Sequence, residues 1–273
     1  MFCLTREVRF AVNGDRAAAE GDRPTNSYGG YPSLRGFGHW LALDVTVAGP
    51  LEESSSYLIN IKQIDAAVRQ LVVPFVSDAV RGKHPLTPEQ CLPEILRRLA
   101  LQFPSLRIEA VALKLSPFLC VSIRESEAPM VRLSQKFEFS ATHRLHNPAL
   151  AEQENNLIYG KCNNPHGHGH NYELQVTLIG KPNASGILID VPAFERIVSS
   201  TVIDRFDHKN LNVELPEFRE LVPTVENIAM TIHRLLKPRL ADAGAKLASV
   251  TVWETPKTWC EYAEEEERVE GRG

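Results

Sequence analysis

Histidines and a cysteine crowd into one short stretch in the second half of the chain. Its sequence is Cys162-Asn163-Asn164-Pro165-His166-Gly167-His168-Gly169-His170. Side chains two residues apart on a β-strand point to the same face, so the imidazoles of His168 and His170 can reach one ion. Zinc favours imidazole nitrogen, and a catalytic zinc needs three protein ligands and one open position. We expect His143, on the preceding predicted strand, to be the third ligand.

Histidine has commoner roles than metal binding, because an isolated one is usually a surface residue or a hydrogen-bonded core residue. Three histidines within five residues, beside a cysteine and a further histidine on the paired strand, favour a metal site. His166 shares the parity of His168 and His170, but it follows Pro165 in a turn, where strand alternation need not hold. We therefore interpret His166 as a turn residue near the site. The two glycines between these histidines are expected to let the backbone pack closely beside the ion.

Cys162 lies outside this expected ligand set and has no neighbouring cysteine. It is either a buried structural thiol or a base or nucleophile whose thiolate is favoured by nearby positive charge. The dipeptide Asp207-His208 holds the partners that the second interpretation needs. These are an imidazole to activate the thiol and a carboxylate to orient the imidazole.

Glu254 ends an apolar predicted strand just before the turn at Thr255-Pro256. A carboxylate there suits a ligand that offers two parallel N–H donors, as a 2-amino-4-oxo pyrimidine ring does. A surface glutamate at a strand end is the alternative interpretation.

Strands and helices must position these groups. His168, His170 and alternate residues up to Leu178 share one parity, which predicts a strand. Asp190 is the expected N-cap of a first helix and Thr224 that of a second, and each precedes apolar residues at helical spacing. Two short strands, at about residues 247–254 and 258–264, finish the unit.

The first half of the chain repeats this plan. Gly36-Phe37-Gly38-His39 lies over Gly167-His168-Gly169-His170, and Thr87-Pro88-Glu89-Gln90 lies over Thr224-Val225-Glu226-Asn227. Both halves then close with an apolar strand, a Ser/Thr-Pro turn and a last strand. These matches occur in the same order, which favours a duplication. We predict an α+β fold of two tandem β-β-α-α-β-β units, each an antiparallel sheet with helices on one face.

Together these motifs resemble the 6-pyruvoyltetrahydropterin synthase family and its relative, 6-carboxytetrahydropterin synthase of the queuosine pathway. The likeness covers about residues 132–264 and rests on Phe-Ser-Ala-Thr-His-Arg-Leu, Gly-Lys-Cys-Asn-Asn-Pro-His-Gly-His-Gly-His-Asn-Tyr and Phe-Asp-His-Lys-Asn-Leu. It implies the tunnelling fold, whose β-β-α-α-β-β units join into barrels with sites at unit interfaces. It also implies residue roles: His143, His168 and His170 match the zinc ligands, Cys162 the catalytic cysteine, Asp207 and His208 its activating pair, Glu254 the pterin-anchoring acid, and Thr224 and Glu226 residues that line the pterin pocket.

The resemblance further implies a zinc-assisted carbon–oxygen lyase that acts on 7,8-dihydroneopterin triphosphate with loss of triphosphate. Five residues separate Cys162 from His168, as in the pyruvoyl-forming members, whereas the queuosine enzymes typically have three. The carboxy-forming reaction is the alternative. A non-catalytic zinc- or pterin-binding scaffold is a further one, but metal binding alone would not need Cys162, Asp207 or His208.

The first copy lacks most of these groups. His39 is kept, but Phe37 stands in the place of the second histidine and Leu115 in that of the anchoring acid. One imidazole cannot hold a catalytic zinc. We therefore predict that residues 1–126 form a degenerate, non-catalytic unit and that residues 132–273 form the catalytic unit. Because the family assembles six units as two rings of three, a chain with two units implies a homotrimer, with a dimer as the main alternative.

Composition and charge argue against three other classes of protein: nucleic-acid-binding, membrane-spanning and disulfide-rich. The net charge of −4, without a basic stripe, is unlike that of a nucleic-acid-binding protein. The apolar runs, such as residues 71–76, are too short to span a bilayer. The five cysteines are too widely spaced to indicate a disulfide framework. We expect a cytoplasmic protein with reduced thiols and a small-molecule partner.

Overall fold

The computed structural model describes residues 1–14 and 25–264 of the chain. The chain divides into two compact units. The first comprises Met1–Ser134 together with Ile179–Leu188, and the second comprises Gln135–Leu178 together with Ile189–Gly273. The short segment Ile179–Leu188 therefore folds with the first unit although it follows a strand of the second.

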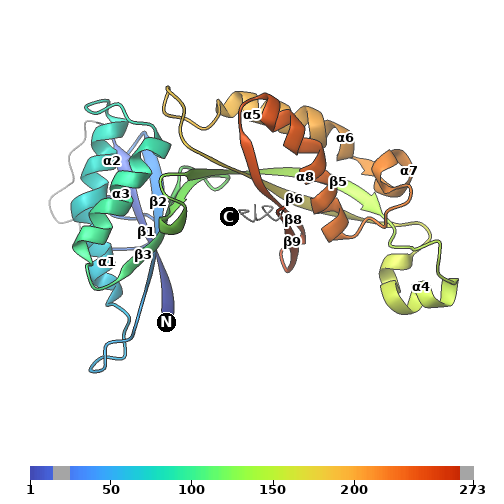
Figure 1. Ribbon diagram of the computed structural model, residues 1–273, viewed down its shortest axis with the longest axis horizontal. Coiled ribbons are helices and arrows are strands. Elements are labelled where there is room, and N and C mark those ends of the chain that lie inside the picture. The colour runs from blue at the N-terminus through green and yellow to red at the C-terminus, as the bar shows by residue number, and fades with distance from the viewer. Residues whose placement is uncertain (15–24, 265–273) are drawn as a thin grey trace, which may run out of the picture. The chain divides into compact units, whose positions relative to one another are not determined.

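The first unit holds four strands in the spatial order β1-β2-β3-β4, each antiparallel to its neighbour. The strands are β1 (Phe2–Asn13), β2 (Gly38–Gly49), β3 (Arg107–Lys114) and β4 (Leu119–Arg124). The helices are α1 (Ile61–Ala67), a π-helical turn (Val68–Val72), α2 (Val73–Val80) and α3 (Pro88–Gln102), with a 3-10 turn at Glu125–Glu127. These helices lie together on one side of the strands (Figure 1). Phe10, Leu43 and Ile64 are among the fully buried residues of the core.

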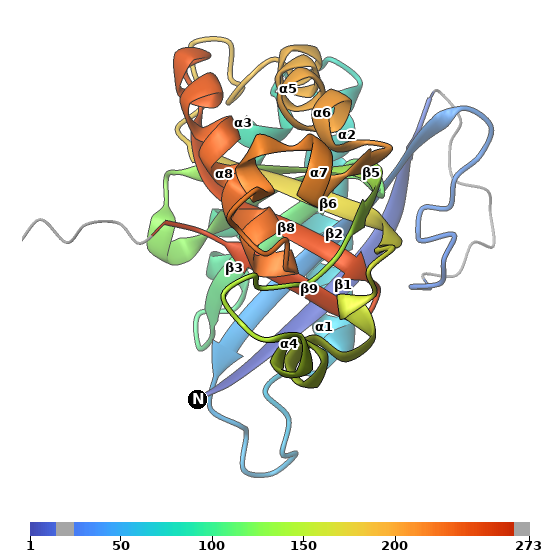
Figure 2. The same ribbon diagram turned by 90° about the vertical axis from the view of Figure 1, so that its right-hand side faces the viewer.

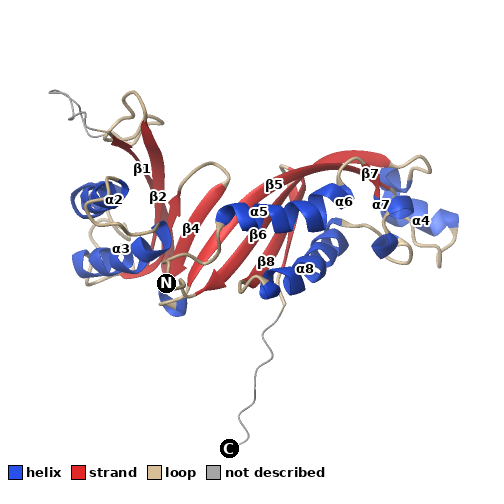
Figure 3. Ribbon diagram, turned by 90° about the horizontal axis from the view of Figure 1, so that it is seen from above, coloured by secondary structure: helices blue, strands red, loops and turns tan. Residues whose placement is uncertain are grey.

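The second unit is built on strands in the order β5-β6-β8-β9, with β7 paired in parallel to β5. The strands are β5 (Val131–His143), which begins in the first unit, β6 (His168–Gly180), β7 (Lys209–Asn210), β8 (Lys246–Thr255) and β9 (Thr258–Tyr262). The α-helices are α4 (Glu152–Tyr159), α5 (Val191–Val198), α6 (Asp204–Phe206), α7 (Leu211–Glu214) and α8 (Val225–Asp242). The remaining turns are 3-10 at Gly160–Asn163 and Pro216–Phe218 and π-helical at Ser199–Ile203. Helices α5 and α8 lie over one face of these strands (Figure 3), and α8 runs beside β8 (Figure 2).

Local sequence explains where the main helices of this unit begin. The Asp190 side chain accepts a hydrogen bond from the Ala193 amide, and that of Thr224 accepts one from the Asn227 amide, so both predicted N-caps are confirmed. Phe194 and Ile232 are fully buried, as the helical spacing predicts.

The predicted mixed α/β fold with antiparallel strands is confirmed, but the sequence did not predict α4, α6, α7 or the short strand β7. Helix α4 buries only Asn155 among its eight residues, so its sequence carries no apolar stripe to reveal it. Within the described residues, the helices are all too short or too polar to cross a bilayer.

Candidate metal centre

Three histidines and one glutamate converge in the second unit. His143 ends β5, His168 and His170 begin β6, and Glu254 lies near the end of β8. One ligand atom from each of the four lies within 4.8 Å of the others. The Nε2 atoms of His143 and His168 are 3.0 Å apart, and a Glu254 oxygen lies 3.3 Å from Nε2 of His143. The group could therefore hold a metal ion.

His143 is held in the form that a metal requires. Its Nδ1 lies 2.7 Å from the Pro223 carbonyl oxygen, and because that oxygen can only accept, Nδ1 carries the proton. The lone pair of a neutral ring is then on Nε2, which faces the other ligands. Burial lowers the pKa of His143 to about 4, and burial likewise lowers the pKa of His168. Both imidazoles are consequently neutral near pH 7.

A further observation fits a cation. The Nε2 atom of His170 is buried and forms no hydrogen bond within the described structure. The nearest Glu254 oxygen is 3.6 Å away. A buried nitrogen without a hydrogen bond costs free energy, which a bound ion would recover. Imidazole and carboxylate donors in this number suit zinc.

The glycines beside the ligands are needed for the close approach of β5 and β6. Gly167 has φ +73°, and a Cβ atom there would lie 3.1 Å from the His143 carbonyl oxygen. At Gly169 a Cβ atom would lie 3.2 Å from Thr142. Side chains at these positions would push the strand that carries His168 away from the end of β5.

Asp207 and His208 are in contact with each other. Asp207 accepts a hydrogen bond from the Ser140 amide and lies 2.7 Å from Nδ1 of His208. The Ser140 amide, together with His208, lowers the pKa of Asp207. His208 adopts φ 57° and leaves 83% of its side chain exposed. His208 and His170 line the same cavity, of about 540 Å³.

Cys162 is not joined to this pair. It lies half-buried on the 3-10 turn after α4, and within the described residues its thiol forms no hydrogen bond to His208. Its carbonyl oxygen accepts a hydrogen bond from the Leu145 amide, two residues after His143. The chain thus places Cys162 near the residues that follow β5, without a hydrogen bond to the imidazole of His208 in the part of the chain that is described.

Two further predicted site residues, Thr224 and Glu226, lie at the start of α8. Thr224 caps α8 directly after Pro223, whose carbonyl binds His143, whereas Glu226 is exposed in the first turn of that helix. Glu254 was assigned to the pterin alone, but its carboxylate also reaches the histidines.

Sequence reasoning missed one residue of the centre. The Tyr172 hydroxyl lies 3.4 Å from Nδ1 of His143, and burial raises its pKa. Tyr172 is two residues after His170, so a strand places its side chain on the same face as those of His168 and His170. This spacing could have identified it from the sequence.

The second half of the chain is similar in sequence to known pterin synthases. The model of the 6-pyruvoyl tetrahydropterin synthase family matches residues 132–265. A 6-pyruvoyl tetrahydrobiopterin synthase of Drosophila melanogaster is 36% identical over 143 residues, covering 50% of this chain and 82% of that protein. A 6-carboxy-5,6,7,8-tetrahydropterin synthase of Haemophilus influenzae is 29% identical over 156 residues, covering 50% of this chain and 100% of that protein.

Among solved structures, 6-pyruvoyl tetrahydropterin synthase of Caenorhabditis elegans matches with 36% identity and a TM-score of 0.48, covering 50% of this chain and 97% of that one. The chain belongs to the 6-pyruvoyl tetrahydropterin synthase family, through its second half. The family predicted from the sequence motifs is thereby confirmed.

Proposed function

We propose that the chain is a zinc-dependent lyase that releases triphosphate from 7,8-dihydroneopterin triphosphate and forms the 6-pyruvoyl product. The observation that carries this proposal is the convergence of His143, His168 and His170 with Glu254, in a chain whose relatives are named for this synthase activity. Zinc would supply Lewis-acid polarisation of a substrate hydroxyl when bound.

The protein groups have separate tasks in this proposal. Cys162 moves a proton on the substrate side chain, and His208, oriented by Asp207, exchanges that proton. The 2.7 Å contact between Asp207 and Nδ1 of His208 leaves Nε2 as the exchanging atom. Glu254 receives the two N–H donors of the pterin ring, and Thr224 and Glu226 line the same pocket.

The first unit has a different task. We infer that it is a degenerate copy of the second, with residues 1–126 structural and residues 132–273 catalytic. In support, each set of elements includes a π-helical turn directly after a helix, Val68–Val72 after α1 and Ser199–Ile203 after α5. A threonine, Thr87 or Thr224, caps the next long helix of each set.

Mass spectrometry of the products formed from 7,8-dihydroneopterin triphosphate tests the proposal. Release of triphosphate with a pyruvoyl side chain is the expected outcome. A 6-carboxy product would support the second candidate, which the Haemophilus influenzae relative favours. Absence of any turnover by zinc-loaded protein would leave only the scaffold interpretation.

A further inference from the structure

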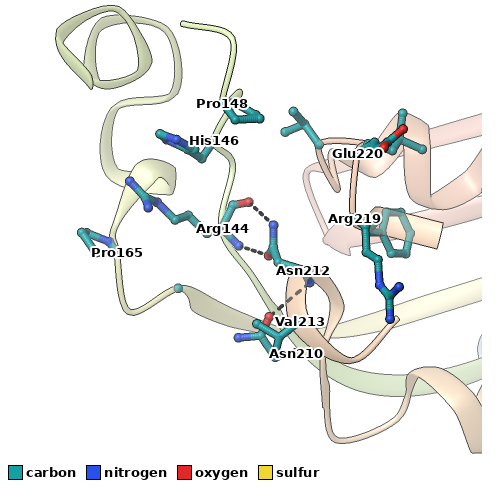
Figure 4. Close-up of a pocket in the computed structure, with 13 residues that line it drawn as sticks. Arg144, His146, Pro148, Pro165, Asn210, Asn212, Val213, Arg219 and Glu220 are labelled. Atoms are coloured by element: carbon teal, nitrogen blue, oxygen red, sulfur yellow. Dashed lines mark hydrogen bonds between the residues drawn. The ribbon is translucent and has the colours of Figure 1, made fainter. Parts of the chain in front are cut away.

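One residue of the second unit, next to His143 in the chain, contacts two further segments of the proposed site. Arg144 follows the ligand His143, and its Nε donates hydrogen bonds of 3.0 Å to both the carbonyl oxygen and the side-chain oxygen of Asn163. Its backbone amide donates to Oδ1 of Asn212 at 2.7 Å, and its carbonyl accepts from Nδ2 of Asn212 at 3.0 Å. Figure 4 shows this backbone pair, with the Arg144 side chain directed away from Asn212.

The contact with Asn163 holds the turn that carries Cys162. Asn163 is 1% exposed, and its amide accepts from Arg144 and His146 and donates to Glu152 and Asn156. An asparagine amide has two donor hydrogens and one oxygen with two lone pairs, so all of its capacity is used. With the bond from the Leu145 amide to the Cys162 carbonyl, the turn is bound to both residues that follow His143.

The contact with Asn212 holds the segment that carries His208. This segment is tied to β5 at its start, where Asp207 accepts from the Ser140 amide, and at its end, where Asn212 pairs with Arg144. Between them, β7 adds backbone pairing at Ala141 and Thr142. The segment is therefore aligned along the strand that ends in a metal ligand.

We propose that Arg144 is a positioning residue. Its side chain, through Asn163, keeps Cys162 in register with His143, and the pairing of its backbone with Asn212 fixes the point from which that side chain extends. The proposal rests on the function proposed above for Cys162. A displacement of about 1 Å at a reacting group can cost on the order of 10²-fold in rate. Lysine cannot replace the arginine here, because a point charge on a flexible stem lacks the planar guanidinium that engages Asn163.

Full-length, zinc-loaded Arg144→Lys protein tests the inference. We expect kcat to fall by on the order of 10²-fold while KM and zinc content stay within twofold of wild type. Asn212→Asp is the milder second variant, because it keeps the acceptor for the Arg144 amide and removes one hydrogen bond. It should lower kcat less, in the same direction.

The matched control is Arg219→Lys. Arg219 lines the same cavity, of about 290 Å³, but lies across it with its guanidinium directed away from Arg144 (Figure 4). This variant should keep the wild-type kcat.

An assay that uses no substrate tests the positioning role of Arg144 independently of the proposed reaction. The rate of Cys162 alkylation by iodoacetamide in the zinc-loaded protein should change several-fold in Arg144→Lys and remain unchanged in Arg219→Lys. If Arg144→Lys and Asn212→Asp only lower the melting temperature, with wild-type kcat and alkylation rates, the inference is wrong. Loss of zinc in proportion to kcat would also overturn it.

Discussion

One histidine of the metal group, His143, combines burial with a defined tautomer. His143 is fully buried, and its Nδ1 donates to a carbonyl oxygen from a residue 80 positions further along the chain. A partner on the second nitrogen orients a ligating ring and raises its basicity towards a metal. Metal binding should therefore depend on these rings and not on histidine content in general.

His168→Ala is expected to lose most of the bound zinc, because only two imidazoles of the group remain. His39→Ala, at the one histidine that the first half keeps in the matching motif, is the control and should lose none. Wild-type protein should contain about one zinc per chain, since three protein ligands suffice for a catalytic site. Elemental analysis that found two zincs per chain, or none after metal-replete purification, would contradict this prediction.

Cys162→Ala should remove turnover while zinc and pterin binding persist, because the thiol is proposed to move a proton and not to hold either ligand. Loss of general acid–base help typically lowers the rate ~10²–10⁴-fold. Cys3→Ala, at an exposed thiol of β1, is the matched control. Steady-state kinetics with unchanged turnover in Cys162→Ala would take the cysteine out of the mechanism.

His233 gives a pH-dependent prediction away from the metal group. It is 2% exposed on α8, and burial lowers its pKa although Glu264 lies 3.7 Å away. Below about pH 6.5 the unfolded chain then binds a proton that the folded chain resists, so stability falls as the pH falls.

The free energy of unfolding, measured by urea titration between pH 7 and 5, should decrease less steeply in His233→Gln than in wild type. The histidines of the metal group are present in both proteins, so their contributions to the pH dependence of unfolding cancel when the two curves are subtracted. Parallel curves for the two proteins would show that His233 does not contribute.

At the scale of elements, the connection from β6 to α5 is fastened to the start of α3. Thr87 donates a hydrogen bond to the Gly186 carbonyl at 2.5 Å, and the Leu188 amide lies 3.4 Å from the Glu89 carboxylate. Thr87 and Gln90 also form the capping box of α3. The connection and the helix cap therefore share the same side chains.

Gly186→Ala should destabilise the protein. Gly186 has φ +81°, and an added Cβ would lie 2.4 Å from the Gln90 side chain that completes the cap. Gly82→Ala is the control, because Gly82 has φ +72° but open space around it. Overpacking costs about 1–3 kcal/mol, so Gly186→Ala should unfold at lower urea concentration than Gly82→Ala. Equal midpoints would mean that the contact with Gln90 yields without cost.

For the whole molecule, the division of the chain does not follow the repeat. Ile179–Leu188 comes from the second half in sequence but folds with the first unit. Cutting the chain near residue 132 would leave this segment without Thr87 and Glu89. This is a physical reason to expect that the second half depends on the first.

Residues 132–273 expressed alone are expected to aggregate or lose activity, whereas the full-length chain should be a homotrimer. Six units would then be present, the number that the resemblance implies. Light scattering gives the mass directly, and a dimer is the alternative outcome. A monomeric full-length chain, or a soluble and fully active second half, would refute the structural role of the first unit.

The sequence by itself determined what depends on local spacing. Parity along β6 placed His168 and His170 on one face, side-chain oxygens at Asp190 and Thr224 marked helix starts, and the motifs identified the family. These features arise within a few residues of each other, so a periodic pattern reveals them.

Tertiary structure alone decided which distant groups meet. The Pro223 carbonyl on His143, Glu254 within reach of the histidines, and the Asn163 and Asn212 contacts of Arg144 join residues 19 to 111 positions apart. Polar pairs of this kind depend on how strands and loops pack, and a local sequence pattern does not predict that packing. The same reason explains why Cys162 and His208, both predicted from the sequence, are placed on separate segments of the second unit.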